Sequence, residues 1–387
     1  MTAVQTARFA ESDPDEQTLD DPDTFGAELD ALRAEVLASL GAQDAAYIRD
    51  LIVRQRRFDL AGRAFLWAGL FPPAWVIGTG LLSVAKILEN MEIGHNVMHA
   101  QWDWMRDPEI HSTTWEWDNV CPSSQWKHTH NHMHHQWTNV RGMDRDIGYG
   151  IMRIDPEQPW QRWMLGQPAY FVALALAFEY GVGFHDVESD LGSGQPISWE
   201  QVGPKIRETA AKIRTQVMKD YVAFPALSVP FGVPGVLAAA SGALTANVVR
   251  NLWSFAVIFC GHFPDDVELF DPEDVAGETR SQWYRRQALG SANFEGGPLM
   301  HLMTGNLDFQ IEHHLFPDVP SNRYAEMAPR VRQICERHGV GYHTGSFLGQ
   351  FGSVVRKVIR LSVPGRKRTR AVRGARSDQS ARRTPRA

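Results

Sequence analysis

The sequence predicts an all-α membrane protein in which four transmembrane helices form two hairpins below a cytosolic helical cap. Three observations predict this class. Long apolar runs recur along the chain, charge is concentrated near its two ends, and most histidines fall in short clusters close to the apolar runs. The mean hydropathy of the 387 residues is nevertheless below zero, because the charged ends offset the apolar middle.

The two ends of the chain have opposite charge. Residues 1–30 form an acidic tail with nine carboxylates, and residues 364–387 form a basic tail with eight arginines. Both compositions are typical of disordered segments, so we expect the working domain at residues 31–363. We expect no secretory signal, because residues 1–30 are acidic where a signal peptide would be basic and apolar. We expect no nucleic-acid partner, because no basic, aromatic-interleaved fold surrounds the basic tail and the net charge of −6 only averages the two tails. The basic tail has two interpretations, a surface for anionic lipid and a merely solvated segment.

The first hairpin is expected at about residues 60–98. Its first part, residues 60–88, is apolar except for Arg63 and Lys86, and Pro72–Pro73 stands near the middle. About twenty apolar residues span a bilayer, so this stretch predicts two helices that turn near the prolines. A soluble helical core is the competing interpretation.

The second hairpin is expected at about residues 221–262. It would join two apolar runs, 221–242 and 248–262, although Arg250 weakens the second run. An earlier apolar run, 168–183, is expected to lie at the membrane interface. All histidine clusters of one site must lie on the same side of the membrane, so the chain must cross the bilayer an even number of times between them. The three apolar runs that separate the clusters therefore cannot all span the bilayer.

Basic residues predict that both termini and the site lie on the cytosolic side of the inner (cytoplasmic) membrane. They precede each hairpin, whereas the expected outer turns carry no charge, as the positive-inside rule requires. These residues are Arg49, Arg54, Arg56, Arg57, Arg63, Lys205, Arg207, Lys212, Arg214 and Lys219.

The histidine clusters predict a metal centre at the cytosolic ends of the helices. Histidines four residues apart share one face of a helix, and imidazole suits iron, copper and zinc. Eight candidates are too many for one ion but fit two ions with open positions, and iron can activate O2. The candidates are His95, His99, His130, His134, His135, His262, His313 and His314.

Other cofactor chemistry finds little support in the sequence. The three cysteines are widely spaced without a CxxC motif, which argues against a structural zinc site, an iron–sulfur cluster or a disulfide framework. No glycine-rich dinucleotide fingerprint is present. We therefore expect electrons to come from another protein.

The order of these motifs resembles the membrane fatty-acid desaturase family. The chain contains HxxxH, then HxxxHH followed by Thr138-Asn139, then QxxHH, separated by the two apolar hairpins. The segments GHNVMHAQWDWM, HHQWTNVRGMDRDIGYG, CGHFPD and QIEHHLFPDVPSNRY are similar to the actinobacterial and mycobacterial acyl-CoA delta-9 desaturases of that family.

The resemblance implies that the eight histidines bind two iron ions. Gln310 stands where many members have another histidine, so it is a further candidate ligand. Helical spacing alone would also accept His128 and His132, and the resemblance excludes them through the position of Thr138-Asn139. We expect these two histidines beside the site or on the surface.

The activity implied by the resemblance is O2-dependent insertion of a cis double bond into a long-chain acyl-CoA, at position 9 of a stearoyl or palmitoyl chain. The chain has no HPGG motif of a fused cytochrome b5. A separate ferredoxin or flavin oxidoreductase, reduced by NAD(P)H, is therefore the implied electron donor. The alternatives are an acyl-lipid desaturase, a hydroxylase or alkane monooxygenase on the same scaffold, and a membrane metal carrier or sensor.

Residues around the clusters provide further candidates. Ligating imidazoles usually donate their second N–H to a carboxylate, and this predicts partners for them at Glu92, Asp144, Asp146 and Glu312. The tryptophans that precede the second cluster, such as Trp102, Trp104 and Trp126, suit either an acyl channel or an interfacial belt. The predicted substrate contacts are Trp115, Trp117, Lys127 and Arg145, with Arg153 as a further candidate for the CoA phosphates.

Overall fold

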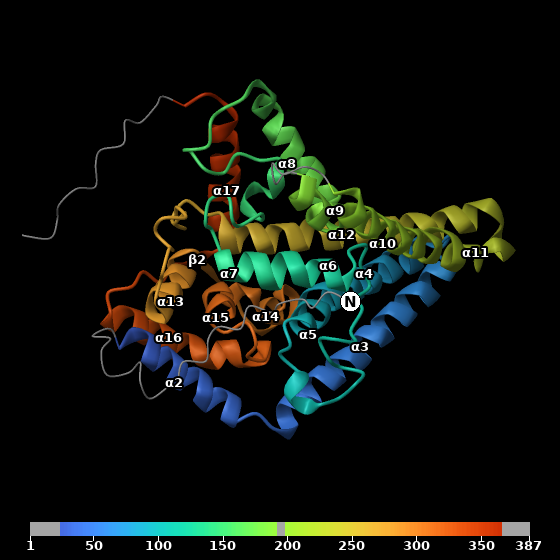
Figure 1. The fold of residues 1–387 in the computed structure, drawn as a ribbon. Coiled ribbons are helices and arrows are strands. Elements are labelled where there is room, and N and C mark those ends of the chain that lie inside the picture. Colours follow the sequence, from blue (N-terminus) through green and yellow to red (C-terminus); the bar gives the residue numbers. More distant parts are fainter. Residues whose placement is uncertain (1–23, 192–197, 366–387) are drawn as a thin grey trace, which may run out of the picture.

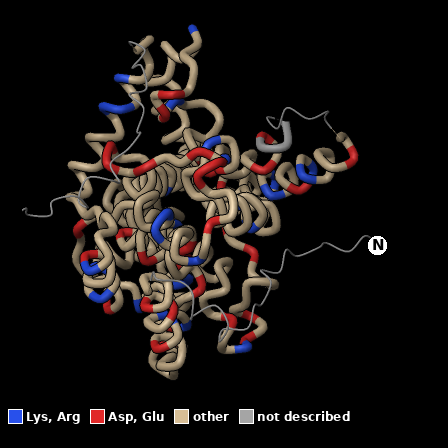
Figure 2. The backbone as a smooth tube through the Cα atoms, turned by 60° about the vertical axis from the view of Figure 1, so that its left-hand side comes forward, with Lys and Arg blue, Asp and Glu red and all other residues tan. Residues whose placement is uncertain are grey.

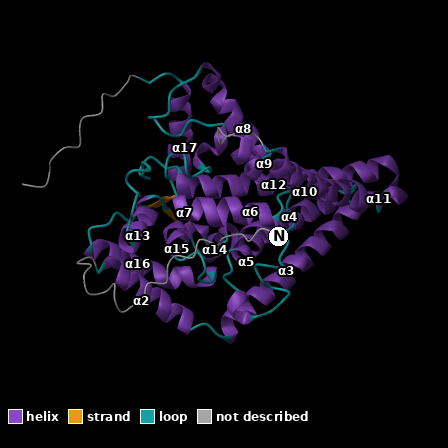
Figure 3. Cartoon of the chain, in the orientation of Figure 1, coloured by secondary structure: helices purple, strands orange, loops and turns teal. Residues whose placement is uncertain are grey.

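The computed structural model describes residues 24–191 and 198–365, and within them the chain is mostly helical (Figures 1 and 3). The basic tail lies outside the described residues except for 364 and 365. The acidic tail was predicted to extend to residue 30, but α2 begins at Phe25, so that boundary is wrong. Leu29 and Leu32 of α2 pack into a buried cluster, and this contact orders the segment despite its acidic composition.

The first half of the described chain contains nine named helices with short 3₁₀ and π segments between them. In order they are α2 Phe25–Ala38, α3 Ala42–Trp67, α4 Pro72–Leu88, η1 Glu89–His95, α5 Asn96–Met98, η2 Asp103–Met105, α6 Ser123–Trp126, η3 Lys127–His134, α7 His135–Trp137, η4 Ile147–Gly150, η5 Arg162–Gly166, α8 Gln167–Leu176, α9 Phe178–Leu191 and α10 Trp199–Val217.

The second half contains the remaining helices and one small sheet. In order they are η6 Met218–Ala223, α11 Phe224–Ala226, η7 Val229–Phe231, α12 Gly232–His262, α13 Arg280–Leu289, β1 Asn293–Glu295, α14 Pro298–Thr304, η8 Leu307–Phe309, α15 Gln310–Leu315, η9 Ser321–Arg323, α16 Tyr324–Arg337, β2 Thr344–Ser346 and α17 Phe347–Ser362. Strands β1 and β2 pair in parallel.

Helices α3 and α4 form the first hairpin, and the predicted turn at the prolines is confirmed. Pro72 and Pro73 occupy the first turn of α4, where proline is tolerated because these backbone N–H groups have no intrahelical partner. A glycine pair then lets the two helices touch. A Cβ added to Gly62 would stand 3.0 Å from the carbonyl oxygen of Gly78, and one added to Gly78 would stand 2.9 Å from that of Gly62. Small residues permit such close approach between helices.

The second hairpin differs from its prediction. Helix α12 runs without a break from Gly232 to His262, so the turn expected between residues 242 and 248 is wrong. The chain instead turns at η7, and the partner of α12 is the long arm formed by α10, η6 and α11 (Figure 1). Arg250 is tolerated inside α12 because its Nη2 lies 2.6 Å from Oε1 of Glu179.

Only part of the expected membrane topology can be recognised from helix length and composition. Within the described residues, one helix, Val229–His262, is long and apolar enough to cross a bilayer. Helix α4 has 17 residues, or about 26 Å, against a hydrocarbon core of about 30 Å. The run expected at 168–183 is divided between α8 and α9.

Helices α2, α13, α15 and α16 enclose one hydrophobic cluster. Acidic and basic residues are interspersed along the outer parts of the chain (Figure 2). Ion pairs such as Arg323 with Asp44 and Arg330 with Glu35 join distant parts of the chain across this surface. Helices α5, α7, α14 and α15 lie at the centre of the molecule, away from the hairpin turns near α11 (Figure 1). The histidine clusters lie on these central elements and at the adjoining end of α12.

Candidate metal centre

Four segments bring the eight candidate histidines together. His95 ends η1, His130 and His134 lie in η3, and His262 is the last residue of α12. His99 follows α5 directly, and the short helices α7 and α15 complete the set with His135, His313 and His314. Seven of the eight are buried and His130 is nearly so, which is unusual for so many imidazoles unless each has a partner.

The histidines divide into two groups. His95, His99, His130 and His313 form one group, and His134, His262 and His314 form the other, with the ligand atoms of each within 4.8 Å of one another. His135 lies between the groups. Its ring centroid is 4.6 Å from that of His99 and 4.5 Å from that of His314.

Two of these segments are π-helical, which the predicted α-helical spacing did not anticipate. In a π-helix the backbone hydrogen bonds join residues five apart and the turn is wider than in an α-helix, so residue i approaches both i+4 and i+5. The ring centroids of His130 and His135 are 4.9 Å apart, and those of His130 and His134 are 5.1 Å apart. The wider turn therefore directs both members of the HH pair toward the ring of His130.

The ring nitrogens of this cluster have the environment of metal ligands. The Nε2 atoms of His99, His130, His134 and His314 are buried and have no hydrogen-bond partner within the described part of the chain. Nε2 of His95 faces Nε2 of His313 at 3.2 Å. Two nitrogens bound at right angles to one ion, each about 2.1 Å from it, stand about 3 Å apart. The spacing matches a shared ion.

Protonation also suits a metal. Burial, together with the neighbouring imidazoles, holds the pKa of His99, His135 and His314 well below the ordinary value. Neutral imidazole is the form that coordinates metals. Imidazole nitrogens fit iron, copper or zinc better than magnesium or calcium.

Two of the predicted carboxylate partners contact the imidazoles. Both oxygens of Asp144 lie 3.1 Å from Nδ1 of His134. Oδ2 of Asp146 lies 3.6 Å from Nδ1 of His134 and 3.8 Å from Nδ1 of His130. A carboxylate on Nδ1 directs Nε2 of the same ring toward a metal.

The other two predicted carboxylates bond elsewhere. Glu92 accepts hydrogen bonds from Tyr47 and Ser321, and Glu312 accepts them from Asn293 and Tyr342. The prediction that these two carboxylates contact imidazoles is corrected by these bonds. They cross-link distant segments instead. Burial raises the pKa of Glu312 to about 7, against the lowering effect of its two hydrogen-bond donors.

Two partners of the histidines, and one partner of the carboxylate Asp146, were missed by the sequence reasoning. Oε1 of Gln287 lies 3.1 Å from Nδ1 of His314, and the Tyr324 hydroxyl lies 3.3 Å from Nδ1 of His313. His185 contacts Asp146. Tyr324 belongs to the QIEHHLFPDVPSNRY segment, which is a weak signal, whereas Gln287 and His185 have no local pattern that marks them.

Gln310 lies beside the second group. Its Nε2 is 3.1 Å from Nε2 of His262, and its Oε1 is buried without a partner among the described residues. Gly261 makes this approach feasible, because a Cβ there would meet the Gln310 side chain at 2.8 Å. The amide is therefore close enough to act on an ion held by this group.

His128 and His132 point away from the cluster, as predicted. Their rings stack on one another with centroids 6.2 Å apart, and both residues are exposed. Nδ1 of His128 pairs with Asp186 at 2.7 Å.

The predicted substrate contacts are only partly near the histidines. Trp117 packs against Trp126, and the Trp126 ring stacks on His130 at 4.4 Å. Lys127 donates to the Ser112 carbonyl. All three guanidinium nitrogens of Arg153 bond to backbone carbonyls, so the suggested phosphate contact of Arg153 is wrong. Arg145 is half-buried, and Trp115 packs against the cluster that contains Trp117 and Trp126.

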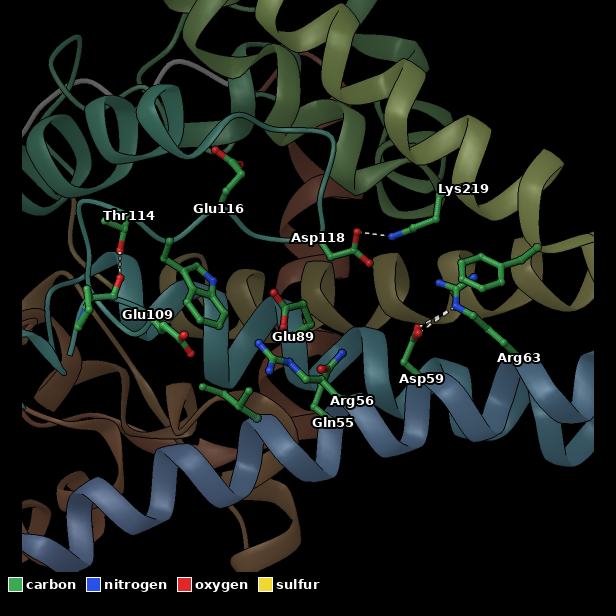
Figure 4. A pocket seen from close by; sticks show the side chains of 14 residues that line it. Gln55, Arg56, Asp59, Arg63, Glu89, Glu109, Thr114, Glu116, Asp118 and Lys219 are labelled. Atoms are coloured by element: carbon green, nitrogen blue, oxygen red, sulfur yellow. Dashed lines mark hydrogen bonds and ion pairs between the residues drawn. The ribbon is translucent and has the colours of Figure 1, made fainter.

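Two cavities of several hundred Å³ are relevant to the site. The larger, of about 620 Å³, is lined by α3, the 108–118 loop and Lys219, and it contains the ion pairs Asp118 with Lys219 and Asp59 with Arg63 (Figure 4). Trp115 lines this cavity, but none of the candidate histidines does. A smaller cavity of about 480 Å³ reaches His135.

Comparisons with known proteins agree with this chemistry. The family model described as fatty acid desaturase matches residues 65–346. The chain is 50% identical over 348 residues to the NADPH-dependent stearoyl-CoA 9-desaturase of Mycobacterium tuberculosis, which covers 89% of this chain and 81% of that protein. It is 26% identical over 301 residues to the sn-1 linoleoyl-lipid 6-desaturase of Synechocystis, covering 76% of this chain and 82% of that protein.

Proposed function

Because this chain belongs to the fatty acid desaturase family, we propose that it is an O2-dependent acyl-CoA desaturase that inserts a cis double bond at position 9 of a stearoyl or palmitoyl chain. The enzyme is an oxidoreductase. The observation that supports the proposal best is the buried cluster of unpartnered ring nitrogens, in two groups, inside a chain 50% identical to a stearoyl-CoA 9-desaturase.

The proposed ligands of two iron ions are the eight histidines, with Gln310 as a further candidate. When bound, iron supplies the redox chemistry by which O2 and two electrons remove two hydrogens from neighbouring methylenes. The protein itself provides position, because adjacent methylenes do not differ chemically. Asp144 and Asp146 hold the Nδ1 side of His134, which keeps its Nε2 directed to the centre.

We propose that the acyl chain runs along the tryptophans beside the first group. Trp126 lies 5.2 Å from His95 and 4.4 Å from His130, measured between ring centroids, and Trp117 extends the aromatic wall. Aromatic side chains provide a rigid apolar surface for methylenes. Trp115 continues this wall toward the larger cavity, whereas CoA contacts by Lys127 and Arg145 stay predictions.

The head group is proposed to be CoA. The relative that shares 50% identity acts on stearoyl-CoA by its name, whereas the one named for an acyl-lipid substrate shares 26%. An acyl-lipid desaturase is therefore the less favoured alternative. A hydroxylase or alkane monooxygenase would use the same ligands but give an alcohol.

Electrons are proposed to come from a separate NAD(P)H-dependent ferredoxin or flavin oxidoreductase. The smaller cavity supports an approach from the face remote from the hairpin turns, because it is lined by His135 together with Trp283 and Leu315. The relative from Mycobacterium tuberculosis is NADPH-dependent by its name.

The membrane arrangement we propose has four helices in two hairpins, with both termini and the site on the cytosolic side of the inner membrane. Residues 229–249 carry no charge over about 30 Å, which matches the hydrocarbon core. Arginines at the base of α3 and uncharged turns agree with the positive-inside rule. Large apolar side chains are exposed on both hairpins, which indicates a lipid environment: Leu60, Phe71, Val76, Leu227, Val233 and Leu237.

The deciding experiment incubates purified, iron-loaded protein with stearoyl-CoA, O2, NADPH and a reductase–ferredoxin pair, and identifies the fatty acids by mass spectrometry. We expect oleate from the wild type, none from His134→Ala, and wild-type amounts from the matched control His128→Ala. Iron that is bound and reducible without any alkene product would overturn acyl-CoA desaturation. An alcohol product would favour the hydroxylase.

A further inference from the structure

Two histidine–aspartate pairs join α9 to the segment that carries His130, His134 and His135. Nε2 of His185 lies 2.8 Å from Oδ1 of Asp146, and Nδ1 of His128 lies 2.7 Å from Oδ1 of Asp186. The pairs are similar in length and both link α9 to the chain around η3. They differ in what the second oxygen of each carboxylate contacts.

Asp146 reaches the proposed ligands and Asp186 does not. The second oxygen of Asp146 faces the Nδ1 atoms of His130 and His134. The second oxygen of Asp186 instead pairs with Lys205 of α10 at 2.9 Å. The side chain of His185 is 5% exposed, whereas that of His128 is 51% exposed. The first pair therefore belongs to the interior of the site, whereas the second pair has an exposed imidazole and does not contact the proposed ligands.

The orientation of Asp146 depends on His185. Asp144 has three strong partners of its own, because it bonds His134 and accepts the backbone N–H groups of Asn139 and Asp146. The shortest contact of the Asp146 side chain is the one with His185, and its contacts with His130 and His134 are longer than 3.5 Å. A carboxylate held at one oxygen by a buried donor cannot turn away from the imidazoles at its other oxygen.

We propose that His185 is a positioning residue for the metal centre. By donating from Nε2 to Asp146, it keeps Oδ2 of that carboxylate against His130 and His134, so that the unpartnered Nε2 atom of each ring stays directed at the ion of its own group. The inference rests on the proposed function in one respect, namely that these histidines hold a metal. The inference adds α9 to the elements that support the site. The sequence singled out neither His185 nor Asp186 on this helix.

The test compares two polar substitutions at His185. Glutamine places an amide N–H near the position of Nε2 and can still donate to Asp146, whereas asparagine is too short to reach it. Both variants are expected to fold, which a circular-dichroism melt would verify. The matched controls are His128→Gln and His128→Asn, which alter the pair that His128 forms with Asp186 of α9.

The readouts concern the metal and need no substrate. They are iron per protein by mass spectrometry, the rate of iron release to a chelator, and the visible spectrum of the cobalt-substituted protein. We expect His185→Asn to lower metal affinity about 10- to 100-fold and shift the cobalt bands, and His185→Gln to stay within about threefold of wild type. Both His128 variants should match the wild type.

Three outcomes would overturn the proposal. They are wild-type metal retention by folded His185→Asn, equal loss from both His185 variants, and equal loss from the His128 controls. The desaturation assay on the wild type is scored separately. A failure there with iron retained would refute the proposed function and leave the result on His185 intact.

Discussion

Nε2 of Gln310 lies 3.1 Å from Nε2 of His262, and the other amide atom, Oε1, is buried without a partner among the described residues. Turning the amide over would direct Oε1 at the same point, where an ion held by His262 and its neighbours would lie. The relationship joins α15 to the end of α12, two elements that meet only in the folded chain.

We expect Gln310→Met to weaken metal binding at the group of His134, His262 and His314 by about 10- to 100-fold, because methionine keeps the length but removes the oxygen. Gln310→Glu, which retains an oxygen, should bind iron nearly as well as the wild type. Iron per protein measured by mass spectrometry checks both. Two full equivalents of iron in Gln310→Met would show that the amide has no role at the ion.

The second prediction concerns Gly305, which has φ +72° and lies against η1. A Cβ there would stand 2.5 Å from the backbone oxygen of Met91. Gly305→Ala therefore has two energetic costs, about 1–3 kcal/mol for the steric overlap and about 1–2 kcal/mol for the left-handed backbone conformation. Gly339 has φ +62° with no atom within 4 Å of such a Cβ, so Gly339→Ala tests the strain alone.

We therefore expect Gly305→Ala to lower the melting temperature more than Gly339→Ala, and to reduce bound iron because η1 carries His95. Thermal unfolding in detergent, with iron analysis of the same samples, measures both effects. Equal melting temperatures would mean that η1 moves aside without cost.

The third prediction concerns Asp220, which forms ion pairs between the two hairpins. Its oxygens lie 2.7 Å from Nζ of Lys86 and 3.1 Å from Nη2 of Arg63, and all three side chains are buried. Asp220→Asn leaves Lys86 as an uncompensated buried cation, which should destabilise the protein by about 3–5 kcal/mol.

Arg63 retains Asp59, so the double variant Asp220→Asn with Lys86→Met should recover most of the stability. The free energies of unfolding of the wild type, both single variants and the double variant form the cycle that checks this. A single variant as stable as the wild type would indicate that water or lipid head groups solvate Lys86.

The fourth prediction concerns removal of the metal. Without an ion, the buried ring nitrogens lose their partner, so the metal-free protein should melt at a lower temperature than the reconstituted one. Binding at 1,000 times the dissociation constant stabilises a folded protein by about 4 kcal/mol. Calorimetry before and after chelation measures the difference. A variant that lacks a ligand, such as His134→Ala, should show a smaller difference, and an unchanged one would contradict the assignment of His134.

Much of the site follows from local spacing. His95 and His99, or His134 and His135, lie within one or two turns of each other in the chain, so the sequence already determines that their rings are neighbours. The exclusion of His128 and His132 needed the family resemblance, because their spacing is equally good. The π-helical turn of η3 could not be predicted, since the periodicity of eight residues does not distinguish it from an α-helix.

By itself the sequence determined the helical class, the first hairpin with its proline turn, and the clusters from which the family resemblance selects the candidate ligands. Each depends on residues close in the chain, where apolar run length and side-chain period act directly. The tertiary structure decided the turn of the second hairpin, because α12 packs Ala239, Ala243 and Ala246 against Leu66 and Leu82 of the first hairpin across the stretch where the turn was expected. It also decided which side chains support the histidines. Glu92 and Glu312 bond to distant hydroxyl and amide groups, whereas His185, Gln287 and Tyr324 reach the site from other helices. Hydrogen-bond partners of buried groups are selected by packing between segments far apart in the chain, and no local pattern encodes that choice.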